Sequence, residues 1–112
     1  MNVRVLTLFP DMVDSVLKTS ITGRAIADGI IDYRSINIRD HAGNKYGKVD
    51  DSLYGGGTGM LMMCVPVYEA WKAAKISLPK EAKPKTIYMS PKGRIFDQKK
   101  AAELSETNDL II

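Results

Sequence analysis

Hydrophobic and polar positions along the chain alternate between the spacing of strands and that of helices. Residues 3–9 form an apolar, branched run that ends at Pro10, which predicts a buried strand followed directly by a helix. Further strands are predicted over residues 30–38, 60–63, 86–89 and from 110 onward. Further helices are predicted to start near Thr22, at Pro66 and after Asp97. This alternation indicates an α/β fold, with a mainly parallel sheet and helices on both of its faces.

Local signals refine several of these elements. Gly29 is predicted to cap the helix that starts near Thr22, and the Asp97 side chain to cap the last helix. Ser90-Pro91-Lys92-Gly93 has the residues of a tight turn. Cys64 follows an apolar run and is expected to be a small buried residue rather than a nucleophile. The helix from Pro66 is expected to bury a stripe made of Val67, Ala70, Trp71 and Ala74.

Ligands of parallel sheets bind beyond the carboxyl ends of the strands. The loop after Met89 is expected to lie there, together with the segment that would follow Ile112. Residues 110–112 begin an apolar strand with no helix or loop after it. We therefore expect the chain to be part of a longer protein.

Composition places the chain among ordinary globular proteins, because 45% of its 112 residues are apolar and 26% are charged. A helix needs about 20 apolar residues to span a bilayer, and every apolar run in the chain is much shorter, so no membrane segment is expected. The one cysteine excludes an internal disulfide and fits a reducing cytoplasm.

Charge is unevenly distributed, although the net charge is only +3. Residues 69–100 carry nine Lys or Arg and three acids, residues 1–68 are balanced, and residues 101–112 carry acids only. The basic stretch could attract phosphates, or it could simply be a solvated helix face and a polar loop.

The run Gly55-Gly56-Gly57-Thr58-Gly59 lies at the end of a long stretch, residues 39–58, that shows no sustained period. Long loops in compact domains are usually functional or disordered. Each glycine costs up to about 1 kcal/mol of backbone entropy relative to Ala, but gives access to positive φ and to close approach of a ligand. Neither a P-loop nor a Rossmann spacing is present, and such a run taken by itself is more often a mobile turn than a binding site.

Several motifs occur together with this run. They are Leu8-Phe9-Pro10-Asp11-Met12, Thr22-Gly23-Arg24-Ala25, Arg39-Asp40, Val49-Asp50-Asp51, Tyr54 to Met63, and Ile87 to Arg94. In this order they resemble the bacterial tRNA (guanine-N1)-methyltransferase family over the whole chain. The resemblance implies a SPOUT-type, trefoil-knotted domain that uses S-adenosyl-L-methionine, truncated here before the knot is completed. It also implies a homodimer that methylates the guanosine immediately 3′ of the tRNA anticodon.

The resemblance assigns roles to two groups of residues. The positions that match the family's first cofactor-contacting segment are Tyr88, Met89, Ser90 and Pro91. The positions expected near the substrate tRNA are Arg24, Asp50, Tyr54, Gly55, Gly56, Gly57 and Gly59. Asp50 and Asp51 could orient the same loop or contact the base. The candidates for phosphate contacts are Arg24, Arg39, Lys45 and Lys48.

The chain departs from the family pattern at two positions. Leu53 stands where the family commonly has Pro, and Tyr46 where it commonly has His. The resemblance also implies that the general base, the remaining cofactor contacts and a carboxyl-terminal tRNA-binding domain belong to segments after Ile112. Residues 1–112 are thus expected to be the amino-terminal portion of the methyltransferase domain and to be inactive alone. Among their acidic residues, Asp50 is a weak candidate for the general base, and the others are weaker. The alternatives are a non-catalytic RNA-binding module and an unrelated α/β domain that binds a small ligand.

Overall fold

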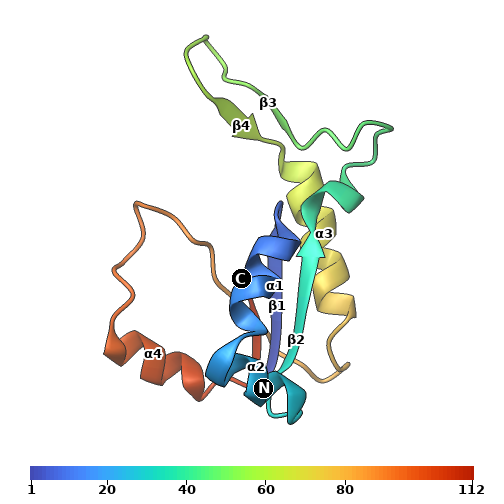
Figure 1. The fold of residues 1–112 in the computed structure, drawn as a ribbon. Helices are drawn as coiled ribbons and strands as arrows, with labels where there is room; N and C mark the ends of the chain where they lie inside the picture. Colours follow the sequence, from blue (N-terminus) through green and yellow to red (C-terminus); the bar gives the residue numbers. More distant parts are fainter.

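Four parallel strands in the order β2-β1-β6-β5 form the centre of the computed structural model, which describes residues 1–112 (Figure 1). A separate antiparallel hairpin, β3–β4, projects beyond the sheet. The elements are β1 (Asn2–Thr7), α1 (Pro10–Leu17), α2 (Ser20–Ala27), β2 (Asp32–Asn37), the 3-10 helix η1 (Ile38–His41), β3 (Asp50–Ser52), β4 (Met60–Met62), α3 (Cys64–Ile76), β5 (Lys85–Thr86), α4 (Gln98–Ser105) and β6 (Asp109–Ile111).

Helices cover both faces of the sheet, so the predicted fold class is confirmed. On one face, Leu6 and Ile36 are paired across β1 and β2 and pack against buried Ala70 and Ala74 of α3. On the other face lies α1, where the Tyr33 hydroxyl of β2 donates a hydrogen bond of 2.8 Å to Asp14. The alternation of side chains along β1 and β2 therefore gives each helix its own face.

Arg4 is the largest fully buried side chain, although it stands in the middle of an apolar strand. Its guanidinium donates to the Asp32 carboxylate at 2.6 Å and to the Asp32 carbonyl at 2.8 Å. It also donates to the Ser77 hydroxyl at 2.7 Å and to the Ser77 carbonyl at 3.1 Å. One side chain of β1 thus joins the start of β2 to the end of α3, and the apolar pattern of residues 3–9 did not indicate this role.

The predicted helix ends are largely confirmed. Asp97 Oδ1 accepts a hydrogen bond of 2.7 Å from the Lys100 amide and caps α4. Gly29 has φ of +72°, and its amide donates to the Ile26 carbonyl while the Ile30 amide donates to the Ala25 carbonyl. These two bonds form a Schellman motif at the end of α2.

Several predicted boundaries and burial states are wrong. Residues Met60–Met62 do form a strand, but all three are exposed because β4 pairs only with β3 and no layer covers it. Cys64 is exposed rather than buried, since α3 begins at this residue, two positions before Pro66. The strand predicted over 86–89 ends at Thr86, and Tyr88 and Met89 lie beyond it with exposed fractions of 87% and 71%. A span of bilayer length and hydrophobicity is found in none of the helices.

Replacing Arg4 by Met is expected to lower the free energy of unfolding by about 3 kcal/mol, because the part-buried hydrogen bonds to the Asp32 and Ser77 carbonyls lose their charged donor. Urea denaturation followed by circular dichroism measures the change. The matched control is Arg34→Met, where an exposed guanidinium lies 3.8 Å from Asp32 and removal should cost less than about 0.5 kcal/mol. Equal effects of the two substitutions would contradict the role given to Arg4.

Candidate functional site

A hollow of about 670 Å³ opens at the carboxyl end of the sheet, where the fold class places ligands. Its lining is mostly apolar and comes from the ends of β1 and β6, from α3, from β4 and from the chain after β5. Trp71 of α3 is fixed in this wall, because its indole N–H donates a hydrogen bond of 3.1 Å to the Thr86 hydroxyl. The Tyr68 ring stacks on Trp71 with 6.0 Å between the ring centroids. The hollow thus has an apolar, partly aromatic surface.

Two of the four predicted cofactor-contacting residues line this hollow. Tyr88 and Met89 belong to its lining, whereas Ser90 and Pro91 follow farther along the chain. The predicted turn is present, since the Gly93 amide donates a hydrogen bond of 2.9 Å to the Ser90 carbonyl. Residues 87–97 then swing away from the sheet before the chain returns as α4 (Figure 1). We call residues 87–97 the arch.

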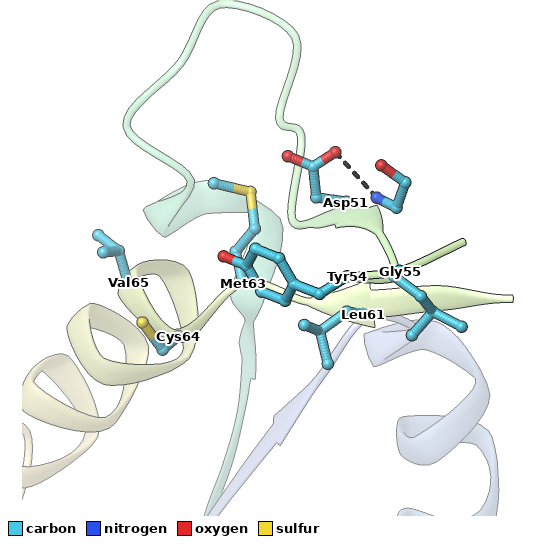
Figure 2. Close-up of a pocket in the computed structure, with 9 residues that line it drawn as sticks. Asp51, Tyr54, Gly55, Leu61, Met63, Cys64 and Val65 are labelled. Atoms are coloured by element: carbon cyan, nitrogen blue, oxygen red, sulfur yellow. Dashed lines mark hydrogen bonds between the residues drawn. The ribbon is translucent and has the colours of Figure 1, made fainter. Parts of the chain in front are cut away.

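A second hollow, of about 520 Å³, lies at the β3–β4 hairpin (Figure 2). Tyr54, Gly55 and Leu61 line it from the hairpin, and Cys64 and Val65 line it from the first turn of α3. Met63 and Cys64 border both hollows. The two hollows therefore meet at the amino end of α3.

The glycines of the hairpin adopt conformations that other residues avoid. Gly55, Gly56, Gly57 and Gly59 have φ of +85°, +80°, +119° and +122°. This explains why the turn needs four glycines. Leu53, the departure from the family pattern, lies beside them, because a Cβ on Gly59 would be 3.7 Å from Leu53 Cδ1.

Acidic residues sit at the start of the hairpin. Asp51 accepts hydrogen bonds from the Ser52 amide at 2.9 Å, drawn in Figure 2, and pairs with Lys48 at 3.1 Å. The amide hydrogen bond first, and then Lys48, hold the pKa of Asp51 below its ordinary value, so its carboxylate remains charged. Asp50 is half-buried in β3 opposite Met62.

The structure groups most of the residues expected near the tRNA, but not all. Asp50, Tyr54 and the four glycines share the hairpin. Helix α2, which carries the exposed Arg24, lies at the amino ends of the strands and therefore at the opposite end of the molecule (Figure 1). Arg39 donates to the Gly47 carbonyl at 3.4 Å, and Lys45 and Tyr46 are exposed.

Two residues that organise this region were not singled out from the sequence. Asn44 Oδ1 accepts hydrogen bonds from the Tyr46 and Lys48 amides, and its Nδ2 donates to the Lys48 carbonyl at 2.9 Å. Val49 is fully buried, and its carbonyl accepts a hydrogen bond of 2.7 Å from the Met63 amide at the base of the hairpin. An Asn in a turn is a recognisable signal for such bonding, but the burial of Val49 depends on contacts distant in sequence.

Comparison with known proteins identifies the family. The family model described as "tRNA (Guanine-1)-methyltransferase TrmD" matches residues 1–112. The chain belongs to this tRNA (guanine-1)-methyltransferase family. The "tRNA (guanine-N(1)-)-methyltransferase" of Ruminiclostridium cellulolyticum is 49% identical over 108 residues, which cover 96% of this chain and 46% of the relative. That of Pseudoalteromonas translucida is 47% identical over 110 residues, which cover 98% of this chain and 42% of the relative.

A solved structure extends the similarity to the fold. The tRNA (m1G37) methyltransferase from Aquifex aeolicus matches with a TM-score of 0.79 and 31% identity, covering 100% of this chain and 50% of that one. The α/β fold expected for the family is thereby confirmed. The chain spans less than half the length of the curated relatives named above.

Replacing Gly57 by Ala is expected to destabilise the hairpin by about 1–3 kcal/mol, because φ of +119° is strained for an L-residue. Hydrogen exchange at the amides of β3 and β4 should become faster, while the urea midpoint of the sheet stays unchanged. Thr58→Ala is the matched control within the same turn. Unchanged exchange in the Gly57 variant would show that the turn does not hold this conformation.

Proposed function

We propose that the protein transfers a methyl group from S-adenosyl-L-methionine to N1 of the guanosine 3′-adjacent to the tRNA anticodon. The observation that carries this proposal is the family match over residues 1–112, which spans both hollows. We further propose that residues 1–112 are the amino-terminal portion of the methyltransferase domain. On this view the protein works as a cytoplasmic homodimer, with a carboxyl-terminal tRNA-binding domain outside these residues.

The hollow at the carboxyl end of the sheet suits the adenine of the cofactor. Its walls are mostly apolar, and Tyr88 and Met89 remain accessible at its border. An adenine ring is held by burial against apolar groups and by a few backbone hydrogen bonds. Tyr88, Met89, Ser90 and Pro91 would hold it, with Trp71 in the same apolar lining as Tyr88 and Met89. When bound, the cofactor supplies a sulfonium methyl group for displacement.

The hairpin would seat the target guanine. Its positive-φ glycines carry no side chains, so a flat base can approach the backbone closely. Because Met63 and Cys64 border both hollows, a base at the hairpin would face the hollow proposed for the cofactor. This chain would thus align the two reactants, which is the larger part of what such a displacement requires.

Guanine N1 normally carries a proton, so methylation also needs a general base. Asp51 is occupied by Lys48 and by the Ser52 amide, and a carboxylate with a lowered pKa is a poor base. Asp50 is paired with Met62 in the β3–β4 ladder. It is a weak candidate for the general base, though better than Asp51. We therefore propose that the base comes from a segment beyond residues 1–112.

The main alternative, an RNA-binding module built on residues 69–100, receives less support from the side-chain contacts. Three of its nine cations are already paired with acids: Lys72 with Glu69 at 3.0 Å, and both Lys85 and Lys100 with Glu103. These pairs leave less free charge for phosphates than the sequence indicates.

The full-length protein is expected to transfer a labelled methyl group to tRNA that has guanosine immediately 3′ of the anticodon. The same tRNA with adenosine at that position is the control and should remain unlabelled, because the proposed transfer is specific for guanine. Scintillation counting of precipitated tRNA measures both. Failure to label the first tRNA would exclude the enzyme and leave the RNA-binding alternative, whose binding would weaken steeply with salt.

Residues 1–112 alone are expected to be inactive and to bind S-adenosyl-L-methionine weakly or not at all, because only one wall of the cofactor site belongs to them. Isothermal titration of this chain with the cofactor tests the expectation. One-to-one binding with a micromolar Kd would contradict it. Trp71 is the only tryptophan of the chain and lies in the wall of the hollow, so its fluorescence gives a second measure of occupancy.

A further inference from the structure

Helix α4, which follows the arch, has few contacts with the rest of the molecule. Of the residues of α4, only Leu104 is buried, and Ala102, Glu103 and Ser105 are exposed. In Figure 1, α4 lies apart from the other helices, at the far end of the arch. A helix with so little buried surface depends on whatever other contacts reach it.

One ion pair ties this helix to the sheet. Lys85, the first residue of β5, lies 2.6 Å from Glu103 Oε1 of α4. Lys100, one turn earlier in α4, donates to both oxygens of the same carboxylate at 2.9 and 2.8 Å. Glu103 is therefore shared between a partner within its own helix and a partner in the sheet. The two lysines, Lys100 first, lower the pKa of Glu103 to about 2, so the carboxylate stays charged at neutral pH.

Different contacts hold the two ends of the arch. At one end, β5 continues into the arch, and the Ile87 amide donates a hydrogen bond of 2.8 Å to the Ile111 carbonyl of β6. At the other end, Asp97 caps α4, which the Lys85–Glu103 ion pair links to β5. Between these ends the arch has exposed apolar side chains, with Ile95 and Phe96 89% and 66% exposed. Its conformation therefore depends mainly on where its two ends are held.

We propose that Glu103, through Lys85, is a positioning residue that holds the arch in the form that receives the cofactor. The inference rests on the proposed function, in which Tyr88 to Pro91 of the arch contact the cofactor. Neither side chain belongs to the lining of either hollow, so the effect passes through the arch and not through direct contact. Holding the arch ends in place reduces the conformational freedom that cofactor binding must remove.

The full-length protein with Lys85→Gln separates this tie from helix stability, since it removes the link to the sheet and leaves the Lys100–Glu103 pair intact. Lys100→Gln is the matched control, because it makes the same change of charge but keeps the Lys85–Glu103 link to the sheet. Hydrogen exchange of residues 87–97 is measured by mass spectrometry without cofactor. The Kd of S-adenosyl-L-methionine is measured by titration, and KM and kcat by methyl transfer.

Lys85→Gln and Glu103→Gln are expected to speed exchange in the arch and to raise Kd and KM, each about two- to fivefold, the range of an exposed ion pair. The kcat should stay unchanged, because bound cofactor itself holds the arch in place during methyl transfer. Lys100→Gln should have less than half of these effects. The exchanged pair, Lys85→Glu with Glu103→Lys, should restore arch protection and cofactor affinity.

Unchanged exchange in the arch of the Lys85→Gln variant would overturn the inference. So would faster exchange with an unchanged Kd, because the arch would then not determine cofactor affinity. Failure of the proposed function gives a different result: the unmodified protein would not bind S-adenosyl-L-methionine, while the variants would still alter arch exchange.

Discussion

The buried guanidinium of Arg4 is the constraint on which the rest of the structure depends. It lies between β1, the start of β2 and the end of α3, and its hydrogen bonds to Asp32 and Ser77 determine how α3 lies across the sheet. A charge at 0% exposure is stable only when its donors are satisfied, which few alternative packings would allow. The position of α3 in turn sets Trp71 over β5 and sets Met63 and Cys64 at the junction of the two hollows.

Local chemistry was predictable from the sequence, and long-range burial was not. The cap at Asp97, the turn at Ser90 to Gly93 and the Schellman motif at Gly29 depend on residues within a few positions of each other. By contrast, the run Met60–Met62 has the pattern of a buried strand and is exposed, because periodicity does not say which strand is its partner. Arg4 was missed for the same reason, since its partners are 28 and 73 residues away.

For the candidate site too, motifs in the sequence located the segments, whereas their arrangement in space came only from the structure. The glycine run and the segment from Tyr88 to Pro91 could be located from motifs, and the structure adds that their two hollows share Met63 and Cys64. Sequence reasoning assigned Arg24 and the hairpin to the same tRNA, and the structure adds that α2 lies at the other end of the sheet (Figure 1). If both regions contact one tRNA, the RNA must extend along the molecule, or a second copy must supply one of them. Motif matching alone contains no information on such distances.

The lining of the hollow at the carboxyl end of the sheet is rich in sulfur. Met62, Met63, Cys64 and Met89 all belong to the apolar lining, and Met89 is 71% exposed. Thioethers are soft and conform to flat rings, but they are also the side chains that oxidants convert to polar sulfoxides. The wall that suits an aromatic ligand therefore also carries side chains that oxidants can make polar, and oxidation there would change the surface that such a ligand meets.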